Sequence, residues 1–599
     1  MHLNINNDTM KKLFFALIAL TFAFVGLAQN FVIDSSLNDE LKTMDDNEKV
    51  KINILMKSQS NAADLQRVAM AFATKAERRD FVVNTLKHQA KESQSELMIL
   101  LNNLEVNGSV EEVRPLWIVN SVSCFANKFA ILEIAKRDDI LTVYHIEEFQ
   151  CVESEDVTTP AERCIGREIA ENVTKVNADK VWELGYTGED VLVAVIDTGA
   201  NLNHTDLQGR LWDGGAEYPN HGYDFYSHDN DPSDTHGHGT HVAGTIVGSG
   251  ASGTQTGVAP GAKVMVLKVF HGEDNLTEPT MWVEAMQFAL EHGADVMNMS
   301  LGQPMPNASE KLVLRQACDN TLAAGVVAAV CAGNFRQMSG FAPRPYNIWS
   351  PGDCPPPYLH EDQMVNAGGT SCVISVGAVD FDDVIAYLSS FGPSTWTDVA
   401  QYNDYPYSSG SSTNIGLIRP DVCAPGINVK SLDYSNTHGY CLKNGTSMAT
   451  PCVAGTIALM LSKDHELTPA RIDEILEGTA VPLTAHKSND YGSGRIDALA
   501  AVQAVENYGV EEIEDDGFVV YPNPANNIIY IKYNTVKAQL LTSPQDDELT
   551  VSIYSIDGKL IKKCVPNHNQ IQTDDLGRGV YLLKISTVIG EVFKRIVIS

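Results

Sequence analysis

Three residues that can together carry out nucleophilic catalysis lie far apart in this chain of 599 residues: Asp197, His238 and Ser447. A serine hydroxyl is a weak nucleophile until a base removes its proton. An imidazole does this best when a buried carboxylate holds it in the correct tautomer. We therefore predict one site in which Asp197 orients His238 and His238 activates Ser447.

The sequence around each residue fits a position at the edge of a sheet. Asp197 ends the apolar run 193–196 and precedes Thr-Gly, so it should leave a buried strand at its carboxyl end. His238 lies in the small-residue stretch His-Gly-His-Gly-Thr-His-Val-Ala-Gly, and Ser447 in Asn-Gly-Thr-Ser-Met-Ala-Thr-Pro, each leading into a helix. Any one of these segments alone would be explained by a turn and a helix cap. The three together favour a catalytic site.

The elements that must position these residues follow from short, continuous apolar runs. Runs without alternation are typical of parallel strands that are covered on both faces. Helical patterns over 279–292 and 310–324 separate some of them. The fold class predicted for the central region is therefore α/β, a parallel sheet flanked by helices, with its chemistry at the carboxyl ends of the strands. The predicted strands are 191–196, 264–269, 295–299, 326–331 and 373–376.

The amino-terminal part has two predicted pieces. Residues 1–28 are predicted to be a signal peptide, because Lys11 and Lys12 precede an apolar run that ends at Gly-Leu-Ala. A membrane anchor is the alternative, but the run is short for one, so the mature chain is predicted to be extracytoplasmic and without a transmembrane segment. Residues 29–160 form a small α+β unit, with strands at 50–56, 117–122 and 140–146 and helices at 64–103 and 130–136.

The carboxyl-terminal part changes pattern. Residues 161–508 hold the α/β region, and the acidic stretch 509–517 is predicted to be a linker. Residues 518–599 alternate polar and apolar positions between Pro-Asn and Asp-Gly turns, which predicts a small all-β sandwich. Its predicted strands are 518–521, 528–533, 549–554, 579–585 and 592–598.

Charge limits the partners and suggests a cation. With 43 basic and 76 acidic residues the net charge is -33, which argues against a nucleic-acid partner. Part of this charge lies in the loop that precedes His238, where Asp224, Asp229 and Asp231 are spaced as hard oxygen ligands for a structural Ca²⁺ ion. A solvated acidic loop is the alternative.

The Asp, His, Ser order and the three sequence contexts resemble the subtilisin-like serine peptidases over about residues 170 to 505. The resemblance includes Gly-Val-Ala-Pro-Gly-Ala at 257–262, Ser-Ser-Phe-Gly-Pro at 389–393 and Tyr-Gly-Ser-Gly-Arg-Ile-Asp at 491–497. It implies that Asn334 and the backbone N–H of Ser447 bind the developing oxyanion. It also implies that the chemistry requires no cofactor.

The same resemblance implies a substrate groove. One wall of the pocket for the residue before the cut would be the edge strand Ser300, Leu301, Gly302, and the other would be Ala332 and Gly333. The stretch 335–372, which borders this pocket, is long and departs from the family, so only a broad preference for apolar residues is expected. The loop 248–256 lacks the Asn that supports one family calcium site, which puts that site in doubt despite Asp206.

The flanking units also resemble known modules. Residues 29–155 resemble the family's propeptide, an inhibitor-like chaperone whose tail lies in the active site until it is cut. A general binding module is the alternative. The carboxyl-terminal unit resembles the sorting domains that direct Bacteroidetes proteins through the type IX secretion system, with an immunoglobulin-like adhesion or carbohydrate-binding module as the alternative.

The sequence therefore predicts a secreted or cell-surface serine endopeptidase that hydrolyses peptide bonds through an acyl-enzyme. Its expected partners are protein or peptide substrates, its own propeptide and the type IX secretion machinery. Two rivals remain: a catalytically idle surface adhesion protein, and a maturation protease with one dedicated substrate.

Overall fold

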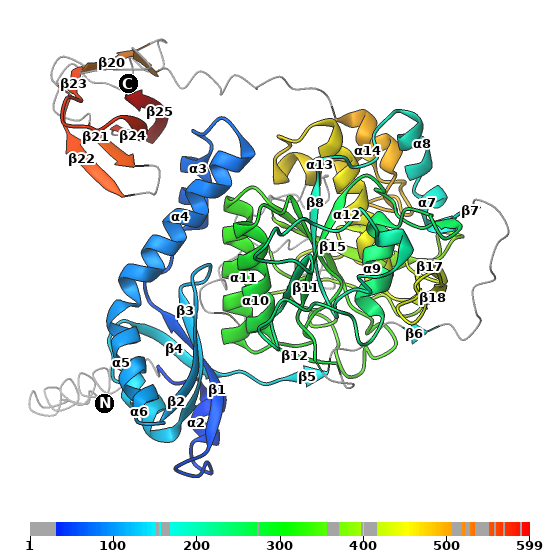
Figure 1. Cartoon of the computed structure of the whole chain (residues 1–599), viewed down its shortest axis with the longest axis horizontal. Helices are drawn as coiled ribbons and strands as arrows, with labels where there is room; N and C mark the ends of the chain where they lie inside the picture. Colours follow the sequence, from blue (N-terminus) through cyan, green and yellow to red (C-terminus); the bar gives the residue numbers. More distant parts are fainter. Residues whose placement is uncertain are drawn as a thin grey trace, which may run out of the picture.

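A computed structural model gives the fold (Figure 1). It describes residues 32–150, 155–156, 168–271, 275–355, 371–396, 399, 416–505, 518–521, 528–533, 550–555, 559–566, 570–587 and 590–598. The predicted signal peptide 1–28 and the predicted linker 509–517 lie outside these residues.

The centre of the molecule is a seven-stranded sheet in the order β16-β15-β14-β13-β8-β11-β9, and every pair in it is parallel. Five of its strands coincide with the apolar runs of the sequence, which confirms the predicted α/β class. The strands are β8 Leu192–Asp197, β9 Gly222–Asp224, β11 Lys263–Lys268, β13 Val296–Met299, β14 Val327–Cys331, β15 Val373–Val379 and β16 Val422–Pro425.

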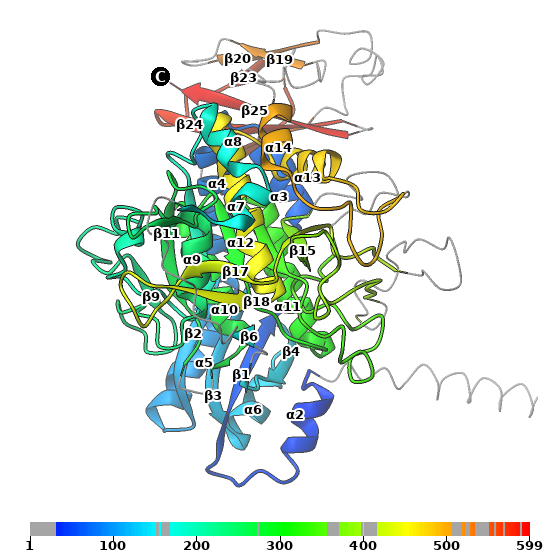
Figure 2. The same ribbon diagram turned by 90° about the vertical axis from the view of Figure 1, so that its right-hand side faces the viewer.

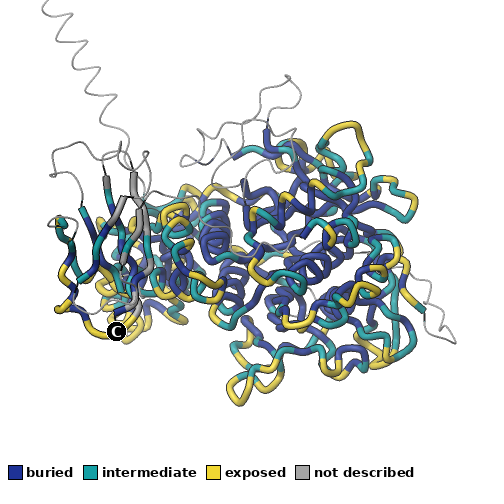
Figure 3. The backbone as a smooth tube through the Cα atoms, turned by 90° about the horizontal axis from the view of Figure 1, so that it is seen from above, coloured by how far each residue is buried: buried dark blue, intermediate teal, exposed yellow. Residues whose placement is uncertain are grey.

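Helices cover both faces of this sheet, as the continuous apolar runs require. In β8, Val193 and Val195 face the core beneath α9 and α12, whereas Ala194 and Ile196 face the core beneath α10 and α11. The dark interior of Figure 3 corresponds to these buried layers. The covering helices are α9 His238–Val247, α10 Pro279–Glu291, α11 Ala308–Ala323 and α12 Thr446–Lys463; α13 Pro469–Thr479 and α14 Ala498–Ala504 follow α12.

The amino-terminal unit is a four-stranded antiparallel sheet in the order β2-β3-β1-β4, covered by helices. The predicted α+β class is confirmed. Its elements are α2 Ser35–Glu40, β1 Lys49–Met56, α3 Ala62–Ala69, α4 Lys75–Ser93, α5 Ser95–Val106, β2 Val110–Leu116, β3 Ser121–Asn127, α6 Lys128–Ile134 and β4 Ile140–His145.

Two expectations for this unit were wrong. The single helix over 64–103 is three helices, because Thr74 and Glu77 form a capping box that starts α4 anew. The strand expected over 117–122 is mostly the turn between β2 and β3. Its apolar residues pack on the α/β region instead of continuing a strand: the Trp117 Nε1 donates to Glu291 at 2.6 Å and the Ile118 N–H donates to Gln287 at 3.0 Å.

The carboxyl-terminal unit consists of two antiparallel sheets, β19-β20-β23 and β22-β21-β24-β25, whose apolar residues form a core of their own. Figure 2 shows the two sheets facing each other at one end of the molecule. The predicted all-β unit is confirmed, but β22 and β23 were missed. The strands are β19 Phe518–Tyr521, β20 Ile528–Tyr533, β21 Thr550–Ser555, β22 Leu560–Cys564, β23 Gln570–Gln572, β24 Gly579–Thr587 and β25 Gly590–Ile598.

Among the residues that the structure describes, no helix is long and apolar enough to cross a membrane.

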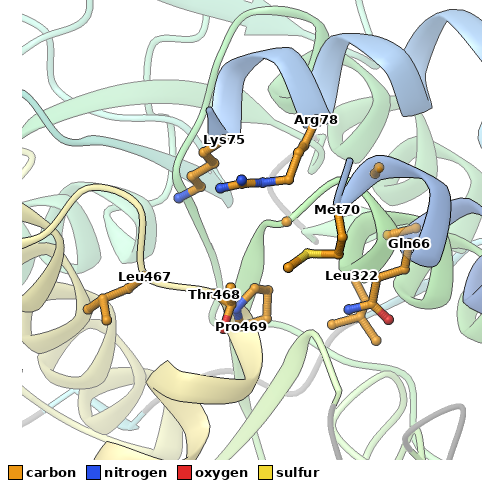
Figure 4. A pocket seen from close by; sticks show the side chains of 11 residues that line it. Gln66, Met70, Lys75, Arg78, Leu322, Leu467, Thr468 and Pro469 are labelled. Carbon is orange, nitrogen blue, oxygen red and sulfur yellow. The ribbon is translucent and has the colours of Figure 1, made fainter. Parts of the chain in front are cut away.

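Helices α3 and α4 extend from the amino-terminal unit along α10 and α11 (Figure 1). A small cavity between α3, α4, the end of α11 and the start of α13 marks this interface, and Figure 4 shows Lys75 and Arg78 reaching from α4 toward it. The Arg78 guanidinium lies 2.6 Å from Glu466. Lys75 is only 3% exposed and its Nζ lies 3.5 Å from the buried Asp295, where burial lowers the pKa of Lys75.

We predict that Lys75→Ala destabilises the full-length chain by about 2 to 3 kcal/mol, because the buried Asp295 then loses one of its two cationic partners and keeps only His465, whose Nε2 lies 3.1 Å away. The matched control is Lys87→Ala, since Lys87 pairs with Glu291 at 2.9 Å on the same helix but is 42% exposed. A surface pair contributes about 1 kcal/mol or less. Thermal unfolding of both variants is measured in a Ser447→Ala background, which lacks the predicted nucleophile. Equal melting temperatures for Lys75→Ala and Lys87→Ala would contradict the prediction.

Candidate active site

A buried carboxylate–imidazole pair lies at the carboxyl end of the sheet. Asp197 is the last residue of β8 and is fully buried, and His238 is the first residue of α9 and is 6% exposed. The His238 Nδ1 lies 2.7 Å from the Asp197 Oδ1, which also accepts from the Thr198 N–H at 2.7 Å. The aspartate therefore fixes the ring so that Nε2 is the nitrogen left for chemistry.

Two residues that the sequence reasoning missed hold this pair in place. The Thr198 hydroxyl accepts from the Gly239 N–H at 2.8 Å and donates to Asp234 at 3.0 Å, so it joins the end of β8 to the start of α9. The Asp234 carboxylate accepts from the backbone N–H groups of His236, Gly237 and Thr240 at 2.8 to 2.9 Å. Because the N-cap position of α9 is Gly237, no capping pattern in the sequence marks Asp234 for this role.

Backbone geometry before His238 requires a glycine. Gly237 has φ of +102°, and a Cβ there would collide with the ring of Tyr434. This is one reason for the small residues that surround His238 in the sequence.

Ser447 is the second residue of α12 and is 2% exposed. Its hydroxyl donates to the backbone oxygen of Ser300 at 3.1 Å, and the Ser300 hydroxyl donates back to the Ser447 carbonyl at 2.9 Å. Within the described residues the structure has no hydrogen bond between Ser447 and His238. The structure therefore brings Asp197 and His238 together directly, and ties Ser447 to the segment after β13.

Asn334 lies beside the nucleophile, three residues after β14. Its Oδ1 accepts from the Thr446 N–H and the Thr446 hydroxyl, both at 3.0 Å. Because a backbone N–H can only donate, these bonds fix which end of the amide is the oxygen. The Nδ2 group is buried and has no hydrogen-bond partner in the described structure. An unused donor at this place is what an oxyanion site needs.

The predicted pocket walls follow β13 and β14 and therefore lie side by side. Ser300 contacts Ser447 as described, and the Gly333 N–H donates to the Thr446 hydroxyl at 3.2 Å. Leu301 and Ala332 are fully buried. Thr446, which binds both Asn334 and Gly333, is a third residue that the sequence reasoning missed, although it directly precedes the serine.

The predicted calcium loop does not assemble its carboxylates around one point. Asp224 accepts from the N–H groups of Tyr226 and Ser227 at 2.8 and 3.1 Å, and its other oxygen lies 3.2 Å from the Lys268 ammonium. Asp229 and Asp231 each accept from the backbone two residues further on. Within the described chain no group of three or more His, Cys, Asp or Glu residues could hold a metal ion. The structure thus gives the Asp224, Asp229 and Asp231 prediction no support.

The other calcium site put in doubt by the sequence is also filled by protein donors. The buried Asp206 accepts from the Ser252 N–H at 2.7 Å and from the Tyr440 hydroxyl at 2.8 Å. Burial raises the pKa of Tyr440, so this hydroxyl stays protonated and donates.

Comparison with known proteins agrees with this architecture. Residues 188–495 match the model of the subtilase family, and residues 519–599 match that of a secretion system C-terminal sorting domain. The chain is similar to subtilisin DY of Bacillus licheniformis, with 35% identity over 55% of this chain and 96% of the relative. It is similar to subtilisin E of Bacillus subtilis (strain 168), with 33% identity over 55% of this chain and 70% of the relative.

A longer relative matches beyond the peptidase region. Bacillopeptidase F of Bacillus subtilis (strain 168) is 30% identical over 510 residues, which is 79% of this chain but only 32% of that protein. The chain therefore spans about a third of the length of this relative.

The fold and the matched region define a subtilisin-like serine endopeptidase architecture. The chain belongs to the subtilase family, in a form that carries a carboxyl-terminal type IX sorting domain and is thus a secreted or cell-surface protein.

Because the loop carboxylates already bind protein donors, we expect the wild type and Asp229→Ala to show the same calcium-dependent change in melting temperature. A ligand at 100 times its Kd stabilises the folded state by about 2.7 kcal/mol, so loss of a real site would be visible. Chelator-treated protein is titrated with Ca²⁺, with Asp382→Ala, an exposed aspartate elsewhere, as the control. A stabilisation that Asp229→Ala alone abolishes would restore the calcium prediction.

Proposed function

We propose that the protein is a secreted serine endopeptidase that hydrolyses peptide bonds of proteins through an acyl-enzyme on Ser447. The observation that carries this proposal is the buried pair of Asp197 and His238, 2.7 Å apart at the sheet edge where α12 presents Ser447. In the proposed mechanism the Ser447 hydroxyl turns from the Ser300 carbonyl to His238. His238 takes the proton as Ser447 attacks, then gives it to the leaving amine.

The oxyanion of the tetrahedral intermediate would be bound by Asn334 Nδ2 and by the Ser447 N–H. The Asn334 Nδ2 group is buried without a hydrogen-bond partner among the described residues. The Ser447 N–H lies in the first turn of α12, where backbone N–H groups have no helical carbonyl to bind. Both donors are fixed before reaction, so they stabilise the charge without reorganising.

The path of the amino-terminal unit's tail supports binding of an extended peptide. Strand β5 Phe149–Gln150 pairs antiparallel with β12 Leu276–Thr277, and β6 Glu155–Asp156 pairs antiparallel with β18 Tyr440–Asn444. Strand β18 leads into Gly445 and the start of α12. The tail thus forms backbone pairs with a segment that follows β11 and with the strand that leads to Ser447, and such pairing is the way in which an extended peptide adds to a strand edge.

On this proposal residues 29–160 are an inhibitory propeptide, residues 161–508 the peptidase domain and residues 509–517 a linker. A surface adhesion protein without activity and a maturation protease with one substrate are the competing functions. An adhesion protein without activity would leave the Asn334 Nδ2 donor and the buried Asp197–His238 pair without a role.

A fluorophosphonate is expected to label the wild type at Ser447, and Ser447→Ala should be neither labelled nor active in peptide hydrolysis. Ser435→Ala, which changes an exposed serine, is the control. An unlabelled, inactive wild type would favour the adhesion protein. Labelling at another residue would remove Ser447 as the nucleophile.

The role of Asn334 is tested in the same assay by two variants. Asn334→Ala and Asn334→Asp should each lower kcat by about 10² to 10³, because both lose the Nδ2 donor. Asn334→Asp keeps an oxygen for the Thr446 N–H, so a purely structural role predicts that this variant is rescued. Rescue by aspartate would therefore contradict the oxyanion assignment.

Maturation gives a separate prediction: Ser447→Ala should accumulate as an uncut precursor, whereas the wild type should begin after a cut between Glu153 and Val173, a window that contains the proposed end of the propeptide at residue 160. The reason is that an intramolecular cut needs the same activated serine as the cleavage of a substrate. Amino-terminal sequencing of both proteins, produced free of other proteases, measures the site. Trimming of Ser447→Ala at the same bond would show that maturation is not autocatalytic.

A further inference from the structure

Trp349 lies in a loop that bridges the two predicted pocket walls. Its backbone N–H donates to the Ala332 carbonyl at 3.0 Å. The next residue, Ser350, exchanges two backbone hydrogen bonds with Gln303, at 2.8 and 3.0 Å. The loop is therefore attached to the segment after β13 and to the segment after β14 at adjacent residues.

The Trp349 side chain fills the space between the two glycines of these walls. A Cβ added to Gly333 would lie 2.6 Å from three indole atoms, and one added to Gly302 would lie 2.8 Å from the Trp349 Cβ. The ring of Phe335 packs edge-on against the indole, with 5.1 Å between ring centroids, and Trp349 is 1% exposed. The slot between Gly302 and Gly333 is thus occupied by this protein's own tryptophan.

This slot adjoins the nucleophile. Gly302 is two residues from the Ser300 carbonyl that accepts the Ser447 hydroxyl, and the Gly333 N–H is bound to Thr446. When the scissile carbonyl of a bound peptide lies at Ser447, the side chain of the residue before the scissile bond has to point toward the segments that hold Gly302 and Gly333. A large side chain there would need the volume that the indole takes, and interiors are packed too densely to hold both.

We infer that Trp349 closes the specificity pocket and restricts the residue before the cut to glycine, alanine or serine. This inference rests on the proposed endopeptidase function, and it replaces the broad apolar preference expected from the sequence. Trp349 acts as a specificity-determining residue that excludes large side chains by occupying their place.

The removal of this side chain leaves the chemistry intact. The indole Nε1 has no hydrogen-bond partner in the described part of the chain, so truncation leaves no protein acceptor unpaired. Asp197, His238, Ser447 and Asn334 make none of their hydrogen bonds to Trp349. Truncation should therefore change the choice of substrate while the catalytic groups stay as they are.

The test uses matured protein made from the full chain and two chromogenic peptides that differ only in alanine or phenylalanine before the cut. The wild type should prefer the alanine peptide by about 100-fold in kcat/KM, the scale on which pockets discriminate by size. Trp349→Gly should raise kcat/KM for the phenylalanine peptide by about 100-fold and leave the alanine peptide within about threefold. The control is Tyr346→Ala, an exposed aromatic in the same loop, which should keep the wild-type ratio.

A cleavage-site profile of the wild type on a denatured proteome decides the inference even where Trp349→Gly does not fold. Cuts after glycine, alanine and serine are expected. Efficient cuts after phenylalanine or leucine, or an unchanged ratio in a folded Trp349→Gly, would overturn the role of Trp349 and leave the endopeptidase standing. A wild type that neither hydrolyses peptides nor reacts with a fluorophosphonate would instead overturn the proposed function.

Discussion

The hydrogen bond between Asp197 and His238 is the interaction around which the site is built, because a carboxyl group at zero exposure needs hydrogen-bond donors from the protein. His238 and the Thr198 N–H supply them. Thr198 and Asp234 in turn hold the start of α9 against the end of β8, so the helix can begin only where the imidazole meets the carboxylate. The end of β8, the turn after it and the start of α9 are thereby held together by the hydrogen bonds of Asp197, Thr198 and Asp234.

Parallel strands then determine what else surrounds this pair. Because β8, β13 and β14 run in the same direction and pair in register, the segments that follow them emerge at one edge. That is why Ser300, which follows β13, and Asn334, which follows β14, can both contact the start of α12 although they are 147 and 112 residues from their partners in the sequence. β5 pairs with β12, which follows β11, and β6 pairs with β18, which precedes α12.

The sequence predicted those parts whose signal is local. Buried strands such as β8 and β14 are continuous apolar runs, and the residues that follow them were correctly placed at the sheet edge. β9 and β16 were missed because one has no apolar run and the other ends in Pro425. The segment from Trp117 was misread because its apolar residues pack on another unit. Nothing in the spacing of Asp224 and Asp229 shows whether backbone amides or a cation bind their carboxylate oxygens. The indole of Trp349 reaches the space between Gly302 and Gly333 only through tertiary folding.

The amino-terminal unit is attached to the α/β region by its tail at β5 and β6, by the α3–α4 arm on α10 and α11, and by the turn between β2 and β3 on α10. A cut in the tail after β5 breaks one covalent bond but none of the contacts of Lys75 or Arg78. If residues 29–160 act as the proposed propeptide, the cut and the release of the unit are two events with separate rates, and the second is a dissociation. Activity would then rise after a lag set by the lifetime of this non-covalent complex, which the contacts of the arm with α10 and α11 prolong.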